Sequence, residues 1–184
     1  MSEHRALGGQ IRASGARTVT LRAIRPGVVD DYGSLWNPDA FDASLRDRLP
    51  VLCWSHDWSE PIGVGVSYTT GREGPTVTCR FDDFTAVPRA RQAYAQVKSG
   101  TIRDCSVGFS RVQRRDPTTD ELERYPGVRE VILSARMDEL SLVLAGAVPG
   151  AEVLAVRSVG KASPRPGSLD AQILDALAIL DARY

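Results

Sequence analysis

Few side chains in this chain could carry acid–base chemistry near neutral pH. The 184 residues include two histidines, and His4 lies in a polar N-terminal stretch. The other, His56, follows the apolar run Val51–Trp54 and precedes a carboxylate, Asp57. An unperturbed imidazole changes charge close to neutral pH, so His56 is the main candidate for a general base. A single histidine near a strand end is more often structural, so this hypothesis depends on other segments.

A serine is the candidate nucleophile. The stretch 101–112 alternates with period two, which predicts a strand with two unlike faces. One face is apolar and comprises Cys105, Val107 and Phe109. The other face is small and polar and comprises Asp104, Ser106, Gly108 and Ser110. Gly108 would allow a substrate or a neighbouring backbone to come close. Ser106 is therefore presented as a nucleophile could be, although a solvated strand serine is the alternative interpretation.

A second strand supplies a candidate carboxylate. In the stretch 137–144, Leu140, Leu142 and Leu144 share an apolar face, which predicts that Glu139 and Ser141 lie on the other. A carboxylate there could accept a hydrogen bond from an imidazole. The alternative is an ordinary exposed glutamate.

The three residues His56, Ser106 and Glu139 together suit nucleophilic catalysis. A serine hydroxyl needs an adjacent base, and a carboxylate can hold the imidazole of that base in the required tautomer. Asp57 is a weaker third member because adjacent residues rarely face each other well. Cys105 is a rival nucleophile, but the alternation places it on the core side, where a thiol is inert. A Gly-x-Ser-x-Gly motif is absent, which argues against an α/β-hydrolase.

Several short strands must position these residues. Strands are predicted at 17–25, 51–54, 62–68, 76–81, 101–112, 129–133 and 137–144. Helices are predicted from Asn37 onward and over 87–99, with a charged loop at 114–127. This pattern predicts a mainly β (α+β) fold, a small and mainly antiparallel β-barrel or sandwich with a few surrounding helices.

Composition narrows the function classes. Basic and acidic residues number 23 each, so there is no electrostatic case for nucleic-acid or anionic-membrane binding. No apolar run reaches the about 18 residues of a membrane span, and we expect no secretory signal. The cysteines Cys53, Cys79 and Cys105 are far apart, which argues against a disulfide framework or a zinc site. We expect a reduced, cytosolic protein without metal or cofactor.

The domain organisation follows from composition. We expect a flexible tail at 1–16, a main domain at 17–158, a linker rich in proline and glycine at 159–168, and an amphipathic helix at 169–184. The last helix would either dock on its own domain or contact a partner.

The chain resembles the prohead (capsid maturation) proteases of tailed bacteriophages over roughly residues 17–157. The matching stretches are Asp39-Ala40-Phe41, Ser55-His56-Asp57, Pro61-Ile62-Gly63, Val97–Gly100, Cys105–Phe109, Asp138–Val143 and Pro149-Gly150-Ala151. Two departures are Asp39, where glycine is commoner, and the segment 145–149, which lacks the usual Pro-Ala-Asn.

The resemblance implies a serine endopeptidase with a fold similar to the herpesvirus assembly proteases, a β-barrel ringed by helices. It implies His56 as base and Ser106 as nucleophile; the herpesvirus relatives use a second histidine as third member, for which we assign Glu139 here. Substrates would be the major capsid protein and scaffold segments, and the enzyme itself, with the 160–168 linker as the candidate self-cleavage region. Cleavage would take place inside the prohead in the host cytoplasm. Backbone N–H groups of 145–149 would form the oxyanion hole, and a homodimer is plausible.

The alternatives are a catalytically inactive phage structural or scaffolding protein with the same fold and, less favoured, a serine esterase.

Overall fold

The computed structural model describes residues 17–158, in which the period-two alternation of the sequence builds one curved sheet. β1 (Thr18–Arg22) buries Val19 and Leu21 completely. β5 (Thr76–Phe81) alternates in the same way and pairs with β1 in antiparallel orientation. Because successive side chains of a strand point to opposite faces, both strands contribute one apolar row to a shared interior.

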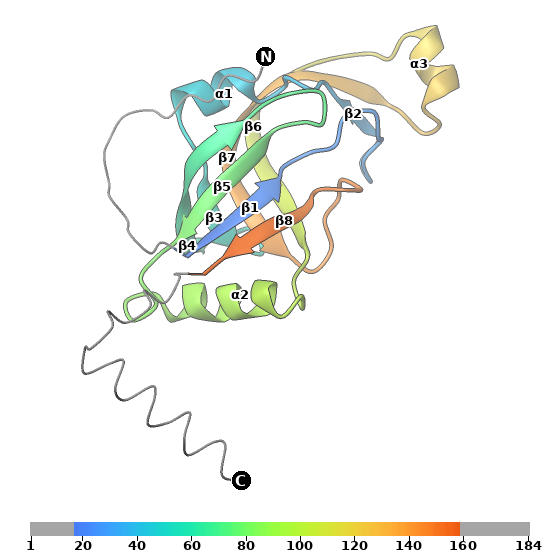
Figure 1. The fold of residues 1–184 in the computed structure, drawn as a ribbon. Helices are drawn as coiled ribbons and strands as arrows, with labels where there is room; N and C mark the ends of the chain where they lie inside the picture. The colour runs from blue at the N-terminus through green and yellow to red at the C-terminus, as the bar shows by residue number, and fades with distance from the viewer. Residues whose placement is uncertain (1–16, 159–184) are drawn as a thin grey trace, which may run out of the picture.

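The sheet closes on itself. The remaining strands are β2 (Ser34–Trp36), β3 (Val51–Trp54), β4 (Asp57–Thr69), β6 (Asp104–Arg115), β7 (Glu130–Val143) and β8 (Glu152–Arg157). Neighbours run in the order β7-β3-β4-β5-β1-β8-β6, and β6 pairs again with β7, which completes a seven-stranded barrel. β2 lies outside this circuit and pairs in parallel with the start of β7. The predicted mainly antiparallel barrel is confirmed (Figure 1).

The described residues also form three helices: α1 (Asp42–Asp47), α2 (Pro88–Lys98) and α3 (Thr119–Arg124). α2 matches its prediction, with a proline in its first turn and Gly100 at a φ of 76° just after its end. It buries Ala90, Ala93, Tyr94 and Val97 and crosses one end of the barrel (Figure 1). α3 lies at the tip of an arm formed by the far ends of β6 and β7 (Figure 1).

β7 corrects the prediction of two separate strands at 129–133 and 137–144. The segment between them, Ser134-Ala135-Arg136, has weak strand character, yet the strand continues through it. β6 runs alongside and supplies the partner, with Gln113 opposite Ser134 and Ser110 opposite Arg136. Tertiary pairing therefore overrides local propensity here.

Other differences concern short elements. The predicted loop at 114–127 contains the end of β6 and also α3, whose first turn is closed by a capping box between Thr118 and Glu121. The predicted helix from Asn37 starts only at Asp42, because the Asn37 N–H still donates to the Ile132 carbonyl of β7. β2 and β8 were not predicted as strands; each is short, and pairing with a distant strand defines it.

Two predicted core residues lie elsewhere. Phe109 is 42% exposed, because a bulge follows Gly108, although its ring still packs edge-on against Trp36. Leu144 is 84% exposed, since β7 ends at Val143 and the chain leaves the sheet. Leu140 and Leu142 are fully buried, as predicted.

The predicted segments 1–16, 159–168 and 169–184 lie outside the described residues. Within residues 17–158, no helix is long and apolar enough to cross a membrane.

Candidate active site

The turn between β3 and β4 positions His56. Trp54 pairs with Asp57, which leaves Ser55 and His56 as a two-residue hairpin loop. Both have positive φ, 53° and 61°, as the favoured two-residue hairpin turns require. Asn-Gly is the usual sequence there, and a non-glycine residue in this region costs on the order of 1 kcal/mol or more. The protein thus carries its candidate base on a strained backbone.

The strained turn is attached to β7 by two hydrogen bonds. The Ser55 N–H donates to the Leu142 carbonyl at 3.1 Å. The His56 N–H donates to Ser141 Oγ at 2.8 Å. These bonds keep the turn against the sheet and supply part of the stabilisation that its unfavourable φ angles require.

Glu139 meets His56 directly. Its Oε1 lies 2.6 Å from His56 Nδ1, and the two side chains are 3% and 44% exposed. A carboxylate only accepts hydrogen bonds, so it places a proton on Nδ1. In the neutral ring this leaves Nε2 as the acceptor. The structure therefore brings two of the three sequence-predicted residues into contact, in the tautomer that a general base needs.

Gly108 explains how Glu139 fits. The two residues are opposed on β6 and β7. A Cβ at residue 108 would lie 2.3 Å from Glu139 Oε1 and 2.8 Å from its Cγ. The sequence predicted that a substrate or a backbone would approach Gly108. Instead the glutamate side chain occupies this space, and the carboxylate lies across the strand toward His56.

Ser106 lies on the same face, one step along the sheet. It is opposite Ser141 in the β6–β7 pair. Directly opposed residues in antiparallel strands have Cβ atoms about 4.5–5.5 Å apart, on one face of the sheet. Ser141 in turn contacts both the Glu139 carboxylate and the His56 backbone. Ser106 is half-buried, whereas Ser141 is 0% exposed, so Ser106 is the serine that a substrate can reach.

The rival nucleophile Cys105 is on the interior face, as predicted. It is fully buried, and its thiol donates to the Arg22 carbonyl at 3.1 Å. Burial raises the pKa of this thiol strongly, with smaller contributions from nearby charges. A thiolate is the reactive form of cysteine, so Cys105 is inert under ordinary conditions.

The rival carboxylates have other partners. Asp57 accepts hydrogen bonds from the Ser59 hydroxyl and N–H, at 2.5 and 2.8 Å, and these bonds lower its pKa. Asp138 pairs with Arg136 at 2.6 Å. Asp104 accepts from the Gly146 N–H at 3.3 Å. None of these contacts involves His56.

Asp104 also bears on the expected oxyanion hole in 145–149. Its bond to Gly146 engages one of the backbone donors that we expected to face the substrate. The same loop nevertheless packs beside β6, the strand that carries Ser106, because a Cβ at Gly146 would lie 2.6 Å from the Cys105 carbonyl oxygen.

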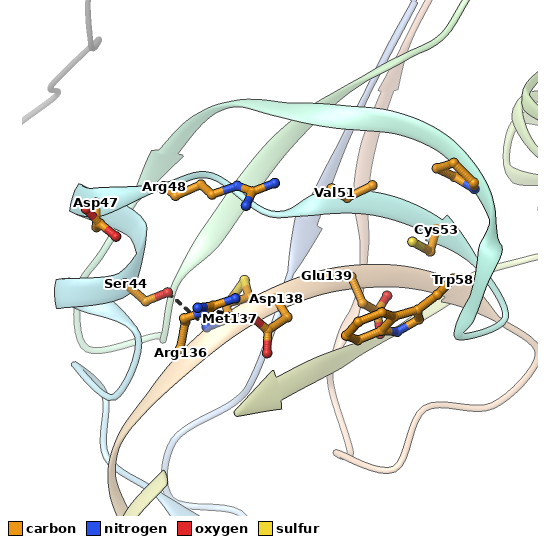
Figure 2. A pocket seen from close by; sticks show the side chains of 11 residues that line it. Ser44, Asp47, Arg48, Val51, Cys53, Trp58, Arg136, Met137, Asp138 and Glu139 are labelled. Carbon is orange, nitrogen blue, oxygen red and sulfur yellow. Dashed lines mark hydrogen bonds and ion pairs between the residues drawn. The ribbon is translucent and has the colours of Figure 1, made fainter. Parts of the chain in front are cut away.

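A cleft of about 530 Å³ opens beside Glu139. Figure 2 shows its lining side chains, contributed by α1 and the following residue, β3, β4 and β7: Ser44, Asp47, Arg48, Val51, Cys53, Trp58, Pro61, Arg136, Met137, Asp138 and Glu139. Trp58 lines this cleft and is 72% exposed. Burial, followed by the charges of Glu139 and Asp57, raises the pKa of the Cys53 thiol to about 11.

Metal-assisted chemistry has no evident ligand set here. Within residues 17–158, there is no group of three or more His, Cys, Asp or Glu side chains that could hold a metal ion.

Sequence reasoning missed the contacts that Ser141 makes with Glu139 and with the His56 backbone. Its signal was present, because Glu139 and Ser141 are two residues apart on one strand and therefore share a face. What the sequence could not supply is the strand register. It sets Ser141 opposite Ser106 and within hydrogen-bond distance of the His56 N–H.

Comparison with known proteins identifies a family for this chain and a solved structure with a similar fold. The family model described as caudovirus prohead serine protease matches residues 26–164. No curated protein gives a significant match. Among solved structures, the chain is similar to KSHV protease, determined in complex with a hexapeptide phosphonate inhibitor. The TM-score is 0.52 at 11% identity, and the alignment covers 89% of this chain and 76% of that one. At this identity the likeness concerns the fold, a barrel of the herpesvirus protease type.

Proposed function

Because this chain belongs to the family of caudovirus prohead serine proteases, we propose that Ser106, His56 and Glu139 form its catalytic triad. The observation that carries the proposal is the contact of 2.6 Å between His56 Nδ1 and the buried Glu139 carboxylate. It leaves Nε2 to accept a proton, beside a strand that presents Ser106 on the same face. Since the family is one of serine proteases, we assign peptide-bond cleavage as the reaction.

In this mechanism, His56 Nε2 takes the Ser106 hydroxyl proton as Oγ attacks the scissile carbonyl carbon. The imidazolium that forms is stabilised by the Glu139 carboxylate. Because this carboxylate is buried, the local dielectric is low and the interaction is stronger. The proton then passes to the leaving amine, and water hydrolyses the acyl-enzyme with His56 again as base. Donors for the oxyanion would come from the backbone of 145–149.

The substrates would be scaffold or capsid-protein segments, and the enzyme itself, during prohead maturation inside the infected host cell. We assign the cleft beside Glu139 to the substrate chain. It adjoins the triad carboxylate and is lined by an exposed indole, Trp58, together with the apolar side chains of Val51 and Met137. Exposed aromatic side chains in such clefts commonly anchor a binding partner.

The test is co-expression with the major capsid protein of the same phage, with intact-mass measurement of that protein. Wild type should truncate the capsid protein, and Ser106→Ala and His56→Ala should not. Ser134→Ala, which removes a serine hydroxyl elsewhere on β7, is the matched control and should truncate the capsid protein normally. Identical capsid-protein masses with wild type and Ser106→Ala would favour the inactive structural protein instead. Hydrolysis of small esters without truncation would favour an esterase.

A further inference from the structure

A buried serine, Ser141, has contacts with the candidate active site but no function assigned to it so far. Ser141 is 0% exposed and lies on β7 between Cys53 of β3 and Ser106 of β6. Its hydroxyl donates to Glu139 Oε2 at 2.6 Å. The same oxygen accepts the His56 backbone N–H at 2.8 Å. One oxygen atom therefore joins the candidate orienting carboxylate to the backbone of the candidate base.

We propose that Ser141 is the positioning residue of this active site, an inference that rests on the triad assigned above. Glu139 has two oxygens, and His56 uses one of them. The Ser141 hydroxyl holds the other, so the carboxylate plane is fixed from both sides. A carboxylate held by one bond could rotate and break its alignment with the ring. Orientation of this kind is what a catalytic acid–base pair requires.

The second bond acts on the backbone of the base. Ser55 and His56 both adopt positive φ in a sequence without glycine at either position. Such a turn persists only where its surroundings hold it in place. The Ser141 hydroxyl supplies one of the two described bonds from β7, and the Ser55 N–H to Leu142 carbonyl bond supplies the other. Ser141 thereby positions the His56 backbone, from which the imidazole extends, and also the Glu139 carboxylate that the imidazole contacts.

Ser141 acts through other residues and not on substrate. It has no exposed surface, and its hydroxyl proton is directed at Glu139. A nucleophilic role is thus excluded for it. Its deletion should lower the rate of the chemical step and leave substrate binding unchanged, because the cleft lined by Trp58 does not include it.

The first experiment compares Ser141→Ala with Ser134→Ala, using a peptide that spans a capsid-protein cleavage site. Ser141→Ala should reduce kcat by roughly 10- to 100-fold, because a misplacement of reacting groups by about 1 Å can cost on the order of 100-fold in rate, and KM should stay within about twofold of wild type. Ser134→Ala should leave both constants unchanged. An unchanged kcat in Ser141→Ala would overturn the inference, as would a loss confined to KM.

The second experiment does not depend on the folding of a Ser141 variant. In the Ser106→Ala protein, which cannot digest itself, proton NMR should show a low-field Nδ1–H resonance from His56. Only His4 could be confused with it, and His4→Gln resolves the assignment. The His56 amide should also exchange slowly with solvent although the residue is exposed, because Ser141 Oγ accepts it. Fast amide exchange would refute the inference.

The two proposals can fail separately. If Ser106→Ala still cleaves, the triad itself is wrong. If Ser106→Ala is inactive and Ser141→Ala behaves like Ser134→Ala, the triad stands and only the positioning role of Ser141 is lost.

Discussion

Glu139 Oε1 occupies the space that a side chain at Gly108 would need. A Cβ on that glycine would lie 2.3 Å from the oxygen, well inside any normal contact. The absence of a side chain on β6 is therefore what lets a carboxylate on β7 lie across the sheet and reach His56.

Gly108→Ala should consequently disable the site and leave the barrel folded. The added methyl displaces the Glu139 carboxylate, and a misplacement of about 1 Å can cost on the order of 100-fold in rate. We expect that loss in kcat/KM with a cooperative thermal transition retained. Gly71→Ala is the matched control, because a Cβ there meets nothing within 4 Å. Full activity of Gly108→Ala would show that the observed Glu139 rotamer is unnecessary.

Glu139→Ala should reduce activity less than Ser106→Ala does. Loss of the carboxylate removes tautomer control and stabilisation of the imidazolium, which in serine proteases is worth roughly 10⁴-fold in kcat at most. Single-turnover cleavage of a peptide substrate by both variants checks the order. Full activity in Glu139→Ala would transfer the third role to Asp57, Asp104 or Asp138, or leave a dyad.

Trp58→Ala should weaken substrate binding. The indole lines the cleft and is 72% exposed, so its removal deletes contact area without opening the core. We expect KM to rise by about tenfold or more, equivalent to roughly 1–2 kcal/mol, with kcat little changed. Tyr32→Ala is the control, since Tyr32 is 74% exposed and does not line the cleft. Equal KM values for the two variants would place the substrate elsewhere.

The Cys53 thiol should report the charge of Glu139. Burial and then the Glu139 charge raise the Cys53 pKa to about 11, so the thiolate is scarce until the pH approaches that value. Glu139→Gln removes the negative charge, which lowers the thiol pKa and increases the thiolate present at about pH 9. Alkylation of Cys53 by iodoacetamide, followed by peptide mass spectrometry, should then be faster than in wild type. Asp57→Asn should have a smaller effect, and equal rates in Glu139→Gln and wild type would mean that Glu139 carries no charge.

Asp30 should matter for stability, because its carboxylate organises the loop before β2. It accepts the Ser34 N–H at 2.8 Å, the Tyr32 N–H at 3.0 Å and Trp36 Nε1–H at 2.9 Å. Asp30→Ala leaves the buried donors unpaired, which should lower the free energy of unfolding by about 2–4 kcal/mol. Urea denaturation followed by tryptophan fluorescence measures it. The exposed neighbour Asp31 gives the control, Asp31→Ala, and similar midpoints for the two variants would contradict the prediction.

The sequence alone identified β1 and α2, whose patterns are local. Val19 and Leu21 alternate with polar residues, and α2 has its proline at the start and its glycine after the end. Such signals depend on neighbours along the chain, so they can be recognised without a structure. β2 and β8 lack them, because pairing with distant strands defines both.

For the candidate active site, the sequence determined the residue types: one credible imidazole, a serine on a polar strand face and a glutamate on another. Only the tertiary structure decided their relationships. Register across β3, β7 and β6 sets Glu139 beside Gly108 and Ser141 beside Ser106. A strained turn then brings His56 into contact with Glu139 and Ser141. The physical reason is that strand register depends on hydrogen bonds between segments far apart in the chain. That is why the sequence could propose His56 and Glu139 as partners but could not show that Ser141 holds the two together.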